Sequence, residues 1–154
     1  MKLVRVAAAG LALVAAFVLW SGCAAPRPDN LGVNGGRLFD CPSSPNCISS
    51  QADPADGEHY AAPLSFEGDA PAAWERAKAA ALSLAGARLF EEREGYAAFE
   101  YTSRVMRFVD DLELSLDAPA KSIHVRSASR IGYSDLGANR KRVEALRAAF
   151  ESTR

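Results

Sequence analysis

Four short segments with strand character follow one another in the second half of the chain, and they restrict the fold more than any other feature of the sequence. They span residues 87–92, 96–102, 105–116 and 122–128. The connections are short and contain Glu94-Gly95, Ser103-Arg104 and Ala118-Pro119. Parallel neighbours need a crossover of a dozen or more residues, so these segments are predicted to pair as an antiparallel meander.

Amphipathic helices are predicted on both sides of the meander. The first follows Gly68-Asp69 and ends before Gly86, and its apolar stripe consists of Trp74, Ala77, Ala81 and Leu84. The second covers about 135–150, with one face made of Leu136, Asn139, Val143, Leu146 and Phe150. An edge strand interrupted by Pro63 is expected at 59–66. This order predicts a single α+β domain, a curved antiparallel sheet of about five strands with two helices on one face.

The beginning of the chain has the layout of a secretory signal. Lys2 and Arg5 precede a charge-free apolar run over 6–20, which ends in Ser21-Gly22-Cys23. Small residues directly before a cysteine resemble the lipobox of bacterial lipoproteins, in which the signal is removed and the cysteine sulfur carries diacylglycerol. Residues 1–22 are therefore predicted to be a lipoprotein signal peptide and Cys23 the lipidation site. An uncleaved membrane anchor is the alternative, although the run is short for a bilayer span.

The rest of the chain divides into a linker and a domain. Residues 23–40 are rich in proline, glycine and polar side chains, a composition typical of a flexible tether. Residues 41–154 are predicted to form the domain. The expected location is the cell envelope, with the domain exported, anchored to a membrane by its lipid and facing the periplasm.

Charge and composition exclude several classes of partner. The chain has 18 basic and 19 acidic side chains, a net charge of −1, which does not favour nucleic-acid binding. Three cysteines and two histidines are too few for a zinc site unless nearly all converge, so no metal is expected. Residues 23–103 carry 6 basic and 12 acidic side chains, whereas 104–154 carry 10 and 7. An anionic ligand is therefore expected at the C-terminal part.

Two cysteines, Cys41 and Cys47, lie six positions apart around two prolines. In an exported protein this pair is expected to form a disulfide that shapes a surface loop. A redox-active pair is the alternative, but no Cys-x-x-Cys motif is present.

A polar motif runs from the last predicted strand into the last helix. Its candidate site residues are Arg126, Ser127, Ser129, Arg130, Asp135, Asn139 and Arg140. Three arginines near a helix N-terminus are suited to hold a phosphate or a carboxylate, with Ser134 and Asp135 placed to cap the helix. The alternative is structural, with the arginines paired to carboxylates of the domain itself.

Asp110 is the one carboxylate that interrupts an apolar row. Strand alternation places it on the same face as Met106, Phe108, Leu112, Leu114 and Leu116. A buried aspartate needs a partner, and Arg126 is the predicted one. Asp110, Arg126 and Asn139 are thus predicted to form a buried polar network, unless a bulge at Asp110-Asp111 turns the side chain outward.

Two motifs together carry a family resemblance. Cys-Pro-x-x-Pro-Asn-Cys begins at Cys41, and Arg-Ser-x-Ser-Arg-x-Gly-x-x-Asp-x-Gly-x-Asn-Arg begins at Arg126. Their order and separation resemble the domain of unknown function 1499 family of bacterial envelope and plastid proteins, over about 41–150. The resemblance implies a family domain of unassigned activity, and it supplies neither catalytic residues nor a cofactor.

Catalysis is weakly supported by the sequence. No Gly-x-Ser-x-Gly elbow is present, and His124 and Ser127 point to opposite faces of a strand. Asp110 and Asp111 are adjacent and cannot flank one bond. The leading hypothesis is a lipid-anchored binding or accessory protein whose apolar pocket takes a lipid or another anionic small molecule, with Arg126, Arg130 and Arg140 near its mouth. The alternative is an envelope scaffold with an internal arginine cluster and a protein or cell-wall partner, and a hydrolase is less favoured.

Overall fold

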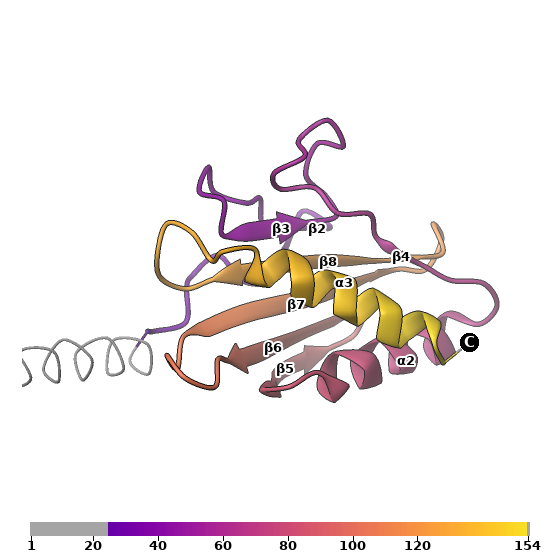
Figure 1. Ribbon diagram of the computed structural model, residues 1–154. Helices are drawn as coiled ribbons and strands as arrows, with labels where there is room; N and C mark the ends of the chain where they lie inside the picture. The colour runs from indigo at the N-terminus through magenta and orange to yellow at the C-terminus, as the bar shows by residue number, and fades with distance from the viewer. Residues whose placement is uncertain (1–24, 154) are drawn as a thin grey trace, which may run out of the picture.

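A computed structural model describes residues 25–153 as a six-stranded antiparallel sheet with two helices on one face (Figure 1). The strand order is β3-β8-β7-β6-β5, and β4 pairs with β8 beside β3. The strands of this sheet are β3 Cys47–Ser49, β4 Leu64–Ser65, β5 Ala87–Arg93, β6 Tyr96–Thr102, β7 Val109–Asp117 and β8 Ser122–Ser129. A separate hairpin joins β1 Val33–Asn34 and β2 Arg37–Leu38. The helices are α2 Ala70–Ser83 and α3 Ala138–Glu151.

These elements confirm the predicted α+β fold and its meander of β5 to β8. Glycines set two of the connections. Gly95 has a φ of +66° in the tight β5–β6 turn, where Arg93 pairs with Tyr96. At Gly86, which has a φ of +83°, a Cβ atom would lie 2.7 Å from the carbonyl oxygen of Thr102. Only glycine fits there without displacing the end of β6.

Both helices bury the faces that their sequences predict. In α2, whose first turn is capped by the Asp69 carboxylate, the buried side chains include Trp74, Ala77 and Ala81. The small alanines of α2 let the helix lie close to the sheet. In α3 the buried side chains are Asn139, Val143, Leu146 and Phe150. The apolar side chains of both helices form the main core together with apolar side chains of β6, β7 and β8.

Leu136 departs from the predicted helix stripe. It lies before α3, which begins at Ala138, and 89% of it is exposed. Leu136 and Gly137 have positive φ angles of 54° and 78°, so the chain makes a turn before the helix starts. The turn removes Leu136 from the face that continues to Phe150.

The third predicted strand is shorter than its sequence pattern. β7 begins at Val109, because residues 103–108 form a turn closed by hydrogen bonds between Ser103 and Phe108. Arg107 has a positive φ of 57° in this turn. Met106 and Phe108 therefore leave the apolar row and are partly exposed, whereas Asp110 stays in it beside Leu112. The Asp110-Asp111 bulge considered in the sequence is absent from the β7 pairing register.

Residues 25–40, predicted to be part of a flexible tether, contact the sheet in this structure. They lie on the face opposite the helices, where Leu38 is buried against Tyr96 and Ala98. The backbone N–H of Gly32 donates to Glu113, and the Arg27 guanidinium donates to Glu100. The composition of this segment did not reveal these polar anchors. Residues 1–24 lie outside the described residues, and with them the predicted signal peptide and Cys23.

The Cys41–Cys47 disulfide is present, with the Cα atoms 5.6 Å apart. It closes the loop that leads into β3, the sheet strand that sequence patterning missed. Within the loop Asn46 donates to the carbonyl oxygen of Gly132, so the closed loop is tied to the segment before α3. The disulfide thus positions β3 along β8.

Breaking this disulfide is expected to lower the free energy of unfolding by about 2 kcal/mol, the chain-entropy value for so small a loop. The comparison is a urea melt of Cys41→Ser/Cys47→Ser against the oxidised parent. In the oxidised, denatured parent neither cysteine should react with a thiol reagent, and reaction at both would contradict the bridge.

Candidate functional site

The sequence-predicted site residues divide between the two faces of the sheet. We call the face covered by α2 and α3 the helix face, and the other the opposite face. In β8, Ser127 lies on the helix face, and Arg126 lies on the opposite face beside Arg130. In β7, Asp110 lies on the helix face, while Asp111 and Glu113 lie on the opposite one. The predicted single cluster is therefore two separate networks.

Asn139 is the centre of the network on the helix face, and its side chain is fully buried. Its oxygen Oδ1 accepts hydrogen bonds from the Ser127 hydroxyl, at 2.6 Å, and from Arg142. Its Nδ2 donates to the carbonyl oxygen of Asn46 and to Ser129 Oγ. The amide thus joins α3 to β8 and to the disulfide loop. Its polar place in an apolar stripe was the sequence signal for this role.

Asp135 holds the start of α3, as the motif predicts. Its carboxylate accepts the backbone N–H groups of Gly137, at 2.9 Å, and Asn139, at 2.7 Å. The first backbone N–H groups of a helix have no acceptor within the helix itself, and their dipoles favour a negative charge. The helix start that the sequence offered as an anion site is thus satisfied internally by Asp135.

The predicted partner of Asp110 is wrong. Asp110 is buried as expected, but its carboxylate pairs with Arg142 Nη2 of α3 at 2.6 Å. Because Asp110 lies opposite Ser129 in the β7–β8 register, its side chain points to the helix face, away from Arg126. Sequence reasoning missed Arg142, although its place three residues after Asn139 on a helix was a usable signal.

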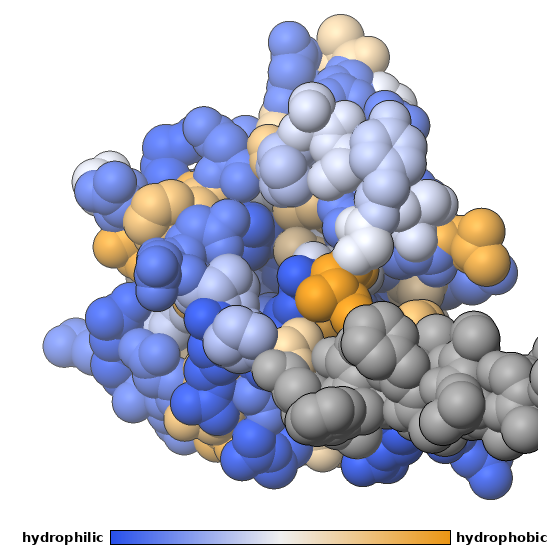
Figure 2. All heavy atoms as spheres, turned by 90° about the vertical axis from the view of Figure 1, so that its left-hand side faces the viewer, coloured by the Kyte–Doolittle hydropathy of each residue, from blue (hydrophilic) through white to orange (hydrophobic). Residues whose placement is uncertain are grey.

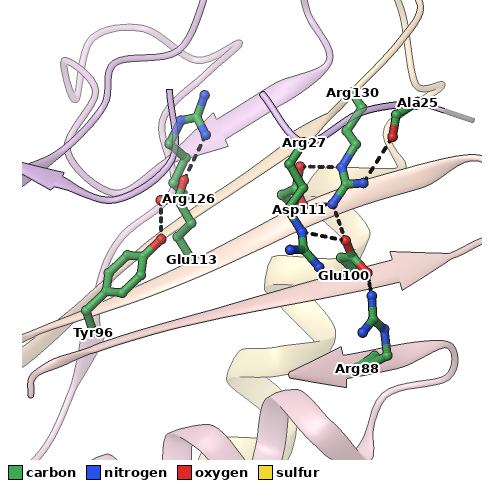
Figure 3. A network of polar contacts seen from close by, with 9 residues as sticks. All are labelled: Ala25, Arg27, Arg88, Tyr96, Glu100, Asp111, Glu113, Arg126 and Arg130. Carbon is green, nitrogen blue, oxygen red and sulfur yellow. Dashed lines mark hydrogen bonds and ion pairs between the residues drawn. The ribbon is translucent and has the colours of Figure 1, made fainter. Parts of the chain in front are cut away.

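Arg126 pairs with Glu113, its direct cross-strand neighbour on the opposite face (Figure 3). Arg126 Nη1 lies 2.8 Å from Glu113 Oε2, and both side chains are at most 2% exposed. Glu113 Oε1 accepts from the Tyr96 hydroxyl at 2.9 Å and from the N–H of Gly32 at 2.7 Å. Burial raises the pKa of Glu113, whereas these three donors favour its charged form.

Arg130 is the centre of a second group of ion pairs on the same face, drawn beside the first in Figure 3. Its Nε and Nη2 bind the two carboxylate oxygens of Asp111 at 2.9 and 2.7 Å, a bidentate arrangement. Nη2 also donates to Glu100, and Nη1 donates to the carbonyl oxygen of Ala25 at 3.2 Å. Glu100 further accepts from Arg27 and Arg88. The Arg130 guanidinium therefore uses its donors in contacts within the domain.

The carboxyl of Glu100 should make the domain sensitive to acid. Burial alone would raise its pKa, but hydrogen bonds from Arg130, Arg27 and Arg88 bring the pKa down to about 2. A pKa lower in the folded than in the unfolded chain adds stability above about pH 4.5, and this is lost as pH falls toward 2. In urea melts between pH 6 and 2, the free energy of unfolding should therefore fall less with pH for Glu100→Gln than for the parent. An identical pH profile would contradict this assignment.

Arg140 also forms hydrogen bonds within the domain. Its guanidinium donates to the carbonyl oxygens of Tyr60, Gly57 and Glu58, at 3.0 to 3.1 Å. These bonds hold the loop before β4 against α3. Arg126, Arg130 and Arg140 thus have three different sets of partners, and the structural reading of the arginine motif is the one that matches the geometry.

An apolar pocket of about 730 Å³ lies beside the helix-face network, between the loops 103–108 and 130–137. An apolar pocket is predicted from the sequence between the curved sheet and the last helix, with three arginines near its mouth, but none of Arg126, Arg130 and Arg140 lines this pocket. Its lining side chains are mostly apolar and include Val105, Met106, Phe108, Ile131 and Leu136. Asp110 and Ser129 also line the pocket. The size and the apolar lining with a few polar groups are those of a site for a small organic ligand.

The serine and histidine side chains considered for catalysis are poorly arranged for it. Ser50 Oγ lies 3.2 Å from His124 Nδ1, and burial lowers the pKa of His124. However, Ser50 is buried and already accepts the N–H of Val125. Neither Ser50 nor His124 lines the apolar pocket. Ser127, the nucleophile considered from the sequence, lies on the other face of the sheet from His124.

The described part of the chain holds no group of three His, Cys, Asp or Glu side chains arranged for a metal ion. Within the same residues, no helix is long and apolar enough to cross a membrane. The geometry therefore defines an α+β domain with a buried ion network on one sheet face and an apolar pocket at one end.

A family model described as a protein of unknown function, DUF1499, matches residues 37–150. The chain belongs to this family, as its two motifs predict. The match includes both sheet faces, the disulfide and the apolar pocket, and it begins at β2, before the predicted domain boundary at residue 41. A search of curated proteins finds no match to this chain.

Proposed function

We propose that this protein is a lipid-anchored cell-envelope protein that binds a lipid-like molecule in the apolar pocket and carries out no reaction on it. The pocket between the loops 103–108 and 130–137 is the observation that carries this proposal. Binding of an apolar ligand in a site with mostly apolar walls is favourable, because apolar surface of both ligand and site is removed from water. An acyl chain is a ligand of this chemistry.

The first residues of the sequence support the proposed location. The Ser21-Gly22-Cys23 ending after an apolar run supports lipidation of Cys23 and export of the domain. A disulfide between Cys41 and Cys47 agrees with an oxidising compartment. Both observations favour the envelope over the cytoplasm.

The arginines play a different part from the one that the motif suggested. Arg126 and Arg130 are buried in ion pairs on the opposite face, and neither lines the pocket. A polar head group would meet the exposed Arg104 at the pocket wall instead. The ligand is therefore recognised mainly by its apolar part, and tight selection of one head group is not expected.

Native mass spectrometry of the full chain, extracted from the membrane of the expressing bacterium, tests the proposal. The expected result is a diacylglyceryl mass on Cys23 and a co-purifying lipid. Ile131→Glu should lose that lipid, because Ile131 lines the pocket. Val33→Glu is the matched control, since Val33 is equally exposed, 38% against 37%, but does not line the pocket. An empty parent protein, or equal lipid loss in both variants, would refute the pocket.

A scaffold role is the second candidate, and the internal arginine network favours it. With those arginines used for folding, the surface rather than a charged site would bind a protein or cell-wall partner. The same measurement separates the two functions. An empty domain bound to a stoichiometric protein partner supports the scaffold.

A further inference from the structure

One end of the molecule exposes an unusual number of large apolar side chains. The loops 103–108 and 130–137, which we call the apolar end, contain Val105, Met106, Phe108, Ile131, Tyr133 and Leu136. Leu136, Val105 and Tyr133 are 89%, 77% and 74% exposed. Figure 2 faces this end and shows hydrophobic atoms near the middle of a mostly polar surface. A cluster of exposed apolar side chains marks a contact surface, because burying each of them away from water is favourable.

The chain enters the described fold at this same end. Arg130 donates to the carbonyl oxygen of Ala25, the first described residue, and Ile131 of the apolar end directly follows Arg130. Cys23 is only two residues before Ala25, at most about 7 Å of extended chain. A lipid on Cys23 would therefore hold the apolar end close to the membrane surface.

The charges of the apolar end suit an anionic membrane. Arg104 and Arg107 are exposed and flank Val105 and Met106 in one short loop. Arginines beside apolar side chains are the arrangement by which peripheral proteins bind phosphate head groups and acyl chains together. Asp135, the acidic side chain in the other loop, already accepts two backbone N–H groups at the start of α3.

We propose that the apolar end rests on the bilayer that carries the Cys23 anchor, with Val105 and Leu136 entering the head-group region and the pocket facing the membrane. This inference rests on the proposed function and adds an orientation to it. The pocket would then exchange its ligand directly with the bilayer. A second copy of the chain and a protein partner are the competing occupants of this surface.

Depth-dependent fluorescence quenching in vesicles tests the orientation. Val105→Cys and Leu136→Cys are made in the full lipidated chain, each labelled with an environment-sensitive dye, and reconstituted in phosphatidylethanolamine and phosphatidylglycerol. Ala120→Cys is the matched control, because it lies in the exposed β7–β8 turn. That turn is at the far end of β7, about 26 Å from Val109 at the strand rise of ~3.3 Å per residue.

Dyes at 105 and 136 should shift to the blue and be quenched by nitroxide-labelled lipid, as expected for a depth of about 5 to 10 Å, while the dye at 120 is unaffected. Equal behaviour at all three positions would overturn the inference. A blue shift without quenching by the nitroxide lipid would also overturn it, and would indicate a protein or a second copy on this surface.

Flotation of the same vesicles keeps this test separate from that of the proposed function. Protein that floats with its lipid anchor but shows no quenching at 105 and 136 refutes the orientation alone. Protein that does not float refutes the anchor and the orientation together. Arg104→Glu/Arg107→Glu should reduce the quenching at 136 without preventing flotation, and unchanged quenching would refute the role of these charges.

Discussion

Glu113→Ala is expected to lower the free energy of unfolding by about 3 to 5 kcal/mol, a large part of the stability of a domain of this size. The substitution leaves Arg126, which is 2% exposed, without its ionic partner. It also removes the carboxylate oxygen that accepts hydrogen bonds from the Tyr96 hydroxyl and the Gly32 N–H. Buried donors without acceptors add to the cost. A urea melt followed by circular dichroism measures the change.

Two further variants separate the contribution of the ion pair from that of the hydrogen bonds. Glu113→Gln keeps an acceptor oxygen but not the charge, so its loss should be smaller. With Arg126→Ala, the double variant should be less destabilised than the sum of the two single variants. Glu94→Ala, at an exposed turn glutamate, should stay within about 0.5 kcal/mol of the parent. A Glu113→Ala loss as small as that of Glu94→Ala would contradict a buried ion pair.

The faces of single elements could be predicted from the sequence. Alternation in β8 correctly separated His124 and Arg126 from Ile123 and Val125, and helical spacing correctly found the buried face of α3 from Asn139 to Phe150. Both predictions rest on local geometry, with a period of two in a strand and of 3.6 in a helix. Local periodicity therefore places a side chain on a face without any knowledge of the neighbouring element.

Partners across two elements could not be predicted in the same way. The pairing of Asp110 depends on which residue of β8 lies opposite it, and a shift of one residue would move Arg126 to the other face. The turn that joins Asp117 to Ser122 sets this register, and with it Asp110 opposite Ser129. Alternation within β8 already places Arg126 away from the apolar row of Asp110, but no pattern within either strand points to Arg142, which lies on α3.

Two further features lacked a sequence signal because they are short or irregular. β3 has three residues, Cys47–Ser49, too few to show alternation. Residues 105–108 are predicted to begin a strand because their apolar side chains alternate, but Arg107 has a positive φ and the chain turns there. This turn produces the wall of the pocket. The pocket wall thus lies at the segment where the local pattern predicted a strand and the structure has a turn.

Asp110→Ala is expected to lower the free energy of unfolding by about 1.5 to 3 kcal/mol, the range for loss of a hydrogen bond to a charged group. Its carboxylate and the guanidinium of Arg142 are 12% and 14% exposed, so water compensates only in part. Arg142 would keep its bonds to Asn139 and Ser127, which limits the loss below that at Glu113. Urea melts at neutral pH give the difference from the parent.

A pair of double-mutant cycles then distinguishes the two arginines. Asp110→Ala combined with Arg142→Ala should be clearly less destabilising than the sum of the single variants, because the two side chains share one ion pair. Asp110→Ala combined with Arg126→Ala should add within about 0.5 kcal/mol, since these side chains lie on opposite faces of the sheet. Coupling in the second cycle and additivity in the first would restore Arg126 as the partner of Asp110 and would require a β7–β8 register shifted by one residue.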